Sequence, residues 1–114
     1  VPPRKRYLLI TFANASTELT PQARANARVF AQALATPQLR NARFAIDGHT
    51  NAIGGAEFNK RLSLARAQAV ARFLTIQGVD ATRLEINGFG FEQLSNPRDP
   101  RSASNRRVEA RRLD

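Results

Sequence analysis

The chain has 114 residues, 42% of them hydrophobic, which is the size and composition of one globular domain with one core. It contains no cysteine, which excludes disulfides, thiolate chemistry and cysteine-based zinc sites. No apolar run approaches the roughly 18 residues that a membrane-spanning helix needs, and the run at 7–12 is too short for the hydrophobic part of a signal peptide.

The chain carries a formal net charge of +9, and 16 of its 18 basic residues are arginine. A strong basic excess favours a polyanionic partner, whereas the simpler interpretation is a solvated, soluble surface. The arginines are spread along the chain, and one Tyr with no Trp leaves no aromatic and basic interleaving of the kind that RNA-binding proteins use. We therefore expect no nucleic-acid partner, and we keep polyanion binding through the arginine-rich surface as one alternative.

The first part of the chain predicts a linker, a strand and a helix. Residues 1–6 form a proline-rich basic lead-in, and residues 7–12 form a continuous apolar run that is typical of a buried strand. Thr20 and Pro21 mark a helix start, as N-cap and first helical residue, and Pro37 marks its end. One apolar stripe at helical spacing is expected to face the core: Ala23, Ala27, Phe30, Ala31 and Leu34.

The middle of the chain predicts a strand at 43–49, a glycine-rich turn at 51–55 and a long helix that ends at Gly78. The helix shows a sustained apolar face in steps of three and four residues: Phe58, Leu62, Ala65, Ala69, Phe73 and Ile76. A strand that leads through a glycine-rich loop into a helix is a good place to hold a small charged group, because the first helical N–H groups have no partner within the helix.

The last part of the chain predicts a third strand at 84–89, a loop at 91–104 and a final strand at 105–113. Charged residues alternate through the final segment, which favours an edge or half-exposed strand. Consecutive strand–helix units favour parallel neighbours, so we expect the first two strands to lie side by side. Residues 7–114 are predicted to form one α+β domain. Its β-α-β-α-β-loop-β order gives a two-layer sandwich, with a mixed four-stranded sheet and both helices on one face.

Patterns for catalysis and metal binding are weak. His49 is the sole histidine and Asp47 lies on the same face of its strand, but the chain has neither a G-x-S-x-G motif nor a cysteine to act as nucleophile. A metal site needs clustered ligands at defined spacing, which one histidine with scattered carboxylates does not provide. We predict no enzyme activity, no cofactor and no metal.

A ligand pocket is favoured around the glycine-rich turn. Gly54 and Gly55 would form its floor, with Asn51 and Asn59 on the rim and Arg66 behind them. Arg66 lies at the margin of the predicted buried face, where an arginine needs a partner. Its planar fork suits a carboxylate. The pocket is expected to accept a group that carries a carboxylate and hydrogen-bond donors.

Spaced motifs also carry a family resemblance. They are G-H-T at 48–50 with Gly54, N-x-x-L-S-x-x-R-A-x-x-V at 59–70, G-x-G at 88–90 and N-R-R-V-E at 105–109. Together they resemble the OmpA-like C-terminal domain of outer-membrane proteins, the peptidoglycan-associated lipoprotein and flagellar stator subunits. The resemblance covers residues 7–113 and implies a periplasmic domain that binds peptidoglycan non-covalently. Such a domain tethers an outer-membrane or envelope protein to the cell wall, with any barrel or membrane anchor upstream of this chain.

The resemblance also implies roles for individual residues. In such domains the ligand is the diaminopimelate of the stem peptide, whose free end is zwitterionic. Arg66 matches the arginine that takes the carboxylate, and Thr50 and Asn59 match positions that line the site. Arg106 matches the first arginine of the N-R-R motif, which closes the pocket. Asn51 stands where the family has an aspartate that takes the ammonium.

Two positions depart from the family pattern. Asn51 offers an oxygen without charge, and losing a charge-assisted bond costs on the order of 1–3 kcal/mol, or roughly ten- to a hundred-fold in affinity. Ala15 stands where an amide-bearing side chain is common. The alternative is therefore an OmpA-like module that has lost strong wall binding and acts as a spacer or as a docking domain for envelope proteins. An apolar patch on the uncovered sheet face would favour this alternative.

Overall fold

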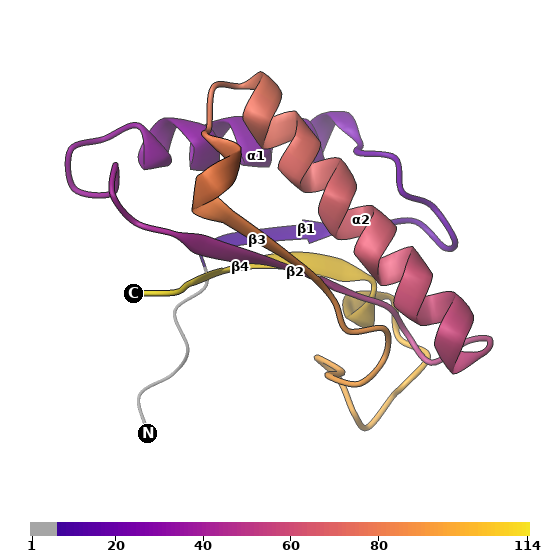
Figure 1. Cartoon of the computed structure of the whole chain (residues 1–114). Coiled ribbons are helices and arrows are strands. Elements are labelled where there is room, and N and C mark those ends of the chain that lie inside the picture. The colour runs from indigo at the N-terminus through magenta and orange to yellow at the C-terminus, as the bar shows by residue number, and fades with distance from the viewer. Residues whose placement is uncertain (1–6) are drawn as a thin grey trace.

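The computed structural model describes residues 7–114, which fold into two layers (Figure 1). One layer is a mixed four-stranded sheet, and the other is a pair of helices that covers one face of it. The elements in chain order are β1 (Leu8–Thr11), α1 (Pro21–Leu34), β2 (Phe44–His49), α2 (Ala56–Ile76), β3 (Leu84–Gly88) and β4 (Arg107–Arg112). The predicted α+β two-layer class is confirmed. The predicted lead-in at 1–6 lies outside the described residues.

Strand β4 lies in the middle of the sheet, because the strand order is β1-β4-β2-β3. It runs antiparallel to both β1 and β2, whereas β2 and β3 are parallel. The prediction that β1 and β2 are neighbours is therefore wrong. Of the two positions predicted for β4, the edge position is wrong, whereas its residues Glu109, Arg111 and Arg112 are partly or fully exposed. The charges of β4 are compatible with a central position because they find partners on the uncovered face of the sheet.

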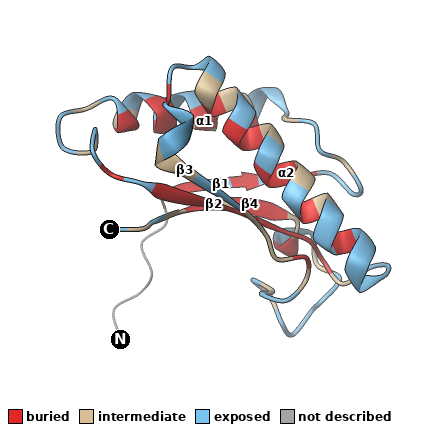
Figure 2. Ribbon diagram, in the orientation of Figure 1, coloured by how far each residue is buried: buried red, intermediate tan, exposed pale blue. Residues whose placement is uncertain are grey.

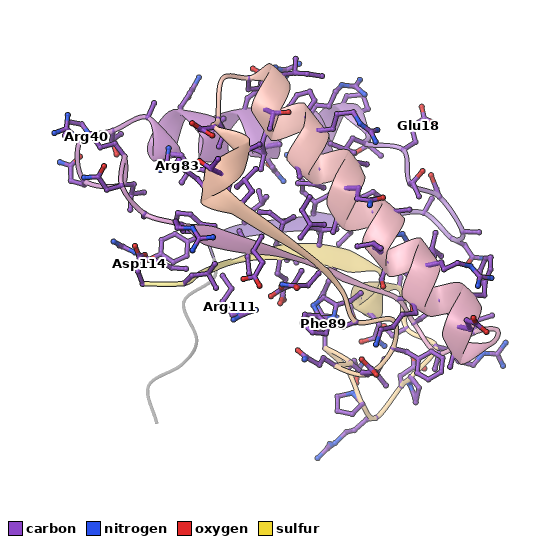
Figure 3. The ribbon with its side chains drawn as sticks, viewed as in Figure 1. Glu18, Arg40, Arg83, Phe89, Arg111 and Asp114 are labelled. Atoms are coloured by element: carbon purple, nitrogen blue, oxygen red, sulfur yellow. The ribbon has the colours of Figure 1, made fainter. Side chains whose placement is uncertain are left out.

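The face of the sheet opposite the helices is polar at its centre. Asp47 is 1% exposed and accepts hydrogen bonds from Arg111 Nε at 3.0 Å and from Asn87 Nδ2 at 2.9 Å. Arg107 Nε lies 3.1 Å from Glu109 Oε1. Figure 3 shows Arg111 on this side, away from both helices. Ion pairs and an amide thus occupy the region where a protein-docking module would present an apolar patch.

Helix α1 forms as predicted. The Oγ1 of its N-cap, Thr20, accepts a hydrogen bond from the Ala23 N–H at 3.0 Å, and Pro21 is the first helical residue. The buried residues are those of the predicted stripe, Ala23, Ala27, Phe30, Ala31 and Leu34 (Figure 2). Phe30 packs edge-on against Phe44 of β2, with ring centroids 5.3 Å apart, which joins α1 to the centre of the core.

Helix α2 buries a different face from the predicted one. Its buried residues are Asn59, Ser63, Arg66, Ala67, Val70, Ala71 and Leu74. The predicted stripe forms the margin of this face instead: Phe58 is 51% exposed and Ile76 is 73% exposed, and the residues between them on the stripe are half-buried. The helix ends at Ile76 with Gln77 as its C-cap, one residue before the predicted Gly78, whose φ of 102° is readily adopted only by glycine.

Two glycines explain why the buried face is shifted. A Cβ on Gly48 would lie 1.9 Å from the carbonyl oxygen of Ser63, and a Cβ on Gly88 would lie 2.7 Å from the backbone nitrogen of Leu64. Helix α2 therefore rests directly on the backbone at the carboxyl ends of β2 and β3. At so close a contact only small side chains, those of Ser63 and Ala67, fit between the helix and the strands. The bulkier apolar side chains of the predicted stripe therefore lie at the flanks of the helix.

We expect Gly48→Ala to lower the free energy of unfolding by about 3 kcal/mol or more, because two backbones would have to separate. Gly55→Ala is the matched control, since Gly55 has a φ of −75° and no heavy atom within 4 Å of a built Cβ. The control is expected to stay within about 1 kcal/mol of the native value. Urea unfolding followed by circular dichroism measures both, and equal effects would contradict the close-approach argument.

Candidate functional site

The five predicted site residues lie together around one cavity. Thr50, Asn51, Asn59, Arg66 and Arg106 all line a hollow of about 200 Å³ between the end of β2, the first turns of α2 and the segment before β4. The remaining lining residues are Asn14, Ala15, Ile53, Gly54, Phe58 and Leu62. The cavity is thus lined by both the β1–α1 loop and the glycine-rich turn. Figure 1 shows the path of the chain from β2 through this turn into α2.

Arg66 is more deeply buried than predicted. Its side chain is fully buried rather than marginal. Its Nε donates to the Ser16 carbonyl at 2.8 Å, its Nη1 to the His49 carbonyl at 3.2 Å and its Nη2 to the Ala13 carbonyl at 3.1 Å. The guanidinium also lies over the Phe12 ring, 5.2 Å from its centroid. Three of its five N–H donors are therefore used by the fold, and no hydrogen bond to the other two is seen within residues 7–114.

The charge of Arg66 is not neutralised by the protein. Within residues 7–114, neither Arg66 nor Arg106 forms an ion pair with a carboxylate. Arg106 is fixed by a 2.8 Å hydrogen bond from its Nε to the Phe12 carbonyl, which leaves its two terminal nitrogens available at the cavity. Burial and the positive charge of Arg106 lower the pKa of Arg66 to about 10, so the Arg66 guanidinium remains a cation at neutral pH.

The two asparagines shape the turn. Asn59 Nδ2 donates to the carbonyls of Ile53 at 2.8 Å and Gly55 at 3.0 Å, so this side chain holds the glycine-rich turn against the start of α2. Asn51 Oδ1 accepts from the Ile53 N–H at 3.3 Å, and Asn51 Nδ2 donates to the Arg101 carbonyl at 3.4 Å. Asn51 thereby ties the turn to the segment that precedes β4.

Thr50 provides a buried hydroxyl without a partner. Its backbone N–H donates to the Gly90 carbonyl at 2.8 Å, which continues the pairing beyond β2 and β3. The residue is 1% exposed, yet its Oγ1 has no hydrogen-bond partner within the described residues. An unsatisfied buried hydroxyl costs stability, and its position on the cavity wall makes it a candidate ligand contact.

His49 and Asp47 are both buried and are engaged in contacts within the fold. His49 is 2% exposed, and its ring stacks on Phe89 with centroids 5.5 Å apart. Asp47 is engaged by Arg111 and Asn87 on the uncovered face of the sheet. The part of the chain that the structure describes contains no group of three or more acidic or histidine side chains arranged to hold a metal ion. Its helices also lack the combination of length and apolarity that crossing a membrane requires.

Two residues that organise the cavity, Asn105 and Ala15, are not among the predicted site residues. Asn105 is fully buried; its Oδ1 accepts from the Asn96 N–H at 2.8 Å and its Nδ2 donates to the Asp99 carbonyl at 3.1 Å, which positions the residue next to it, Arg106. Ala15 adopts a left-handed φ of 55° in the loop whose carbonyls hold Arg66. The N-R-R motif is the signal that could have identified Asn105, whereas the conformation of Ala15 has none.

Comparison with known proteins gives one family. A model described as "OmpA family" matches residues 11–109. The peptidoglycan-associated lipoprotein of Pseudomonas putida is 36% identical over 99 residues, covering 85% of this chain and 58% of that protein. Its namesake in Pseudomonas aeruginosa is 40% identical over 72 residues, covering 61% of this chain and 43% of that protein. The chain thus spans about half the length of these curated relatives.

Solved structures show the same fold. The peptidoglycan-associated lipoprotein from Burkholderia pseudomallei superimposes with a TM-score of 0.82 at 28% identity, covering 96% of this chain and 91% of that chain. The OmpA-like domain of FopA1 from Francisella tularensis gives 0.83 at 22% identity, covering 92% of this chain and 69% of that chain. The second likeness is one of fold alone.

We expect Arg66→Met to lower the free energy of unfolding by at least about 3 kcal/mol, because three main-chain carbonyls would lose a charged donor. Arg61→Met is the control on the same helix, since Arg61 is exposed and meets only Glu57 at 3.6 Å. That change is expected to have little effect on stability. Chemical unfolding of both variants is the measurement, and a stable Arg66→Met protein would show that these hydrogen bonds are not needed for folding.

We expect Thr50→Val to raise the free energy of unfolding by about 1–2 kcal/mol, because a methyl group would replace a buried hydroxyl that has no partner. Thr36→Val is the control, since the Thr36 Oγ1 donates to the Ala33 carbonyl at 2.7 Å. The control removes a satisfied hydroxyl and is expected to bring no gain. Thermal unfolding by calorimetry compares the two, and a loss of stability in Thr50→Val would argue against an unsatisfied hydroxyl.

Proposed function

The chain belongs to the OmpA family, and we propose that it is a non-enzymatic domain that binds peptidoglycan non-covalently through the diaminopimelate of the stem peptide. In this proposal it tethers its parent protein to the cell wall from the periplasm. Two of its relatives and one solved neighbour are named peptidoglycan-associated lipoproteins, and outer membrane protein P5 of Haemophilus influenzae is a further relative. These names support an envelope location and a wall ligand.

The observation that carries the proposal is the cationic cavity. Arg66, Arg106 and Thr50 all line one hollow of about 200 Å³. Within residues 7–114, two N–H groups of Arg66, the terminal nitrogens of Arg106 and the hydroxyl of Thr50 have no hydrogen-bond partner. A carboxylate is planar and accepts paired hydrogen bonds, so it suits two guanidinium groups. The free end of a diaminopimelate side chain is small enough for such a cavity and carries this group.

Asn51 is the proposed contact for the ligand ammonium. It presents a neutral oxygen that already accepts the Ile53 N–H, so the attraction lacks a full charge. We propose that this residue weakens wall binding by roughly ten- to a hundred-fold relative to an aspartate at the same place.

The alternative of a protein-docking or spacer module receives less support. It predicts an apolar patch on the uncovered sheet face, and that face instead holds the Asp47–Arg111 and Arg107–Glu109 ion pairs at its centre. A buried ion pair that is satisfied within the chain offers little to an apolar partner. Wall binding through the cavity is therefore the proposal that the geometry supports best.

The test is calorimetric titration with a stem peptide that contains diaminopimelate. We expect the native chain to bind, Asn51→Asp to bind roughly ten- to a hundred-fold more tightly, and Arg106→Gln to bind at least about tenfold more weakly. Arg101→Gln is the matched control, because it removes an exposed arginine from the neighbouring segment, and it should leave affinity unchanged. Circular dichroism confirms folding of each variant, and Arg66 is left intact because the fold depends on it.

Other outcomes would replace the proposal. Binding by Asn51→Asp alone would mean that the native domain keeps the cavity but has given up this ligand. Binding that weakens steeply with salt, and equally in Arg101→Gln and Arg106→Gln, would point to a polyanion held by the whole arginine-rich surface. If neither the native chain nor any variant binds the stem peptide, the cavity is not a wall-binding site.

A further inference from the structure

The cavity is unusual in charge, because both of its charged lining residues are cations. Arg66 and Arg106 contribute two positive charges, and no Asp or Glu is among the lining residues. The acidic residues near the start of α2 are directed elsewhere. Glu57 and Glu92 line a separate hollow, where Glu92 lies 3.0 Å from Lys60. The cavity itself therefore has nothing to neutralise its two guanidinium groups.

From this charge distribution we propose that the cavity is a receptor for a carboxylate alone, and that an ammonium group on the ligand adds nothing to binding. The proposal rests on the wall-binding function proposed above and specifies its ligand class. The preferred ligand is a stem-peptide side chain that ends in a carboxylate, whether or not an amino group lies beside that carboxylate.

The anionic half of this preference follows from the two arginines. The two cations repel each other in a partly desolvated cavity, so an anion between them is stabilised by both and removes their mutual repulsion. The guanidinium of Arg66 is held immobile by three main-chain carbonyls, so little side-chain entropy is lost when its remaining donors engage a ligand. The buried hydroxyl of Thr50 offers one further neutral donor on the same wall.

The indifference to ammonium follows from the oxygens that could receive it. Asn51 Oδ1 is neutral and accepts the Ile53 N–H, and its amide nitrogen is tied to the Arg101 carbonyl, so the side chain cannot turn without losing both contacts. The Nδ2 of Asn59 donates to two carbonyls of the turn, and the side-chain oxygen of Asn59 is also neutral. An ammonium in the cavity would be attracted weakly by uncharged oxygens and repelled by two guanidinium groups. The attraction and the repulsion oppose each other, so the ammonium adds no net affinity.

The experiment uses three stem peptides that differ at one position. The first contains meso-diaminopimelate, the second contains 2-aminopimelate, which keeps the free carboxylate but lacks the adjacent amino group, and the third contains diaminopimelate with that carboxylate amidated. Each is titrated calorimetrically into the native chain and into Asn51→Asp, at one pH and one salt concentration.

For the native chain we expect dissociation constants of the first two peptides to agree within about threefold, and the amidated peptide to bind at least about tenfold more weakly. For Asn51→Asp we expect diaminopimelate to be preferred over 2-aminopimelate by about tenfold or more, since a charged partner for the ammonium is then present. Arg106→Gln should weaken both carboxylate peptides to a similar degree, while Arg101→Gln should weaken neither.

Three results would overturn the inference, and they are distinguishable. If the native chain binds diaminopimelate at least tenfold more tightly than 2-aminopimelate, the ammonium contributes to affinity. The inference would then be wrong, while the proposed binding to peptidoglycan would be supported. A native chain that keeps its affinity for the amidated peptide does not use the carboxylate, which overturns the inference. If no peptide binds the native chain, the inference and the proposed function both fall.

Discussion

The burial of Arg66 is the interaction on which the rest of the structure depends. Helix α2 approaches the sheet closely enough to bury this residue only because Gly48 and Gly88 have no side chains at the contact. The guanidinium then donates to two carbonyls within the β1–α1 loop and to one at the end of β2. One side chain thus joins the loop, the sheet and the second helix, and these are the elements that enclose the cavity.

The protein solvates this cation without neutralising it. Carbonyl dipoles compensate part of the lost hydration, but they leave the net charge in place, and Arg106 adds a second charge nearby. The unpartnered Thr50 hydroxyl and the left-handed Ala15 add further local costs at the same cavity. Such costs are expected to gather where a fold is shaped for a ligand rather than for maximal stability.

Much of the architecture could be predicted because its signals are local. The Thr20–Pro21 start and the buried stripe of α1 each depend on a few neighbouring residues, and both are confirmed. The glycine that stops α2 was also placed within one residue, since the C-cap is Gln77 and Gly78 follows it. The site residues were also predicted together, from the glycine-rich turn and from spaced motifs, and one cavity contains all of them. The buried face of α2 was misjudged, because an apolar stripe implies large side chains against the sheet, whereas a glycine contact places small and polar ones there.

The elements, their order, the glycines at the helix–sheet contact and the uncharged side chain of Asn51 can all be read from the residues in chain order. Three features depend on the folded arrangement: β4 lies between β1 and β2, Arg66 donates to a carbonyl as distant in sequence as Ala13, and the Thr50 hydroxyl has no partner within residues 7–114. The difference lies in the distance over which each effect acts. Propensity and periodicity act over a few residues, whereas strand order, helix–sheet separation and the satisfaction of a buried charge depend on groups that only folding brings together.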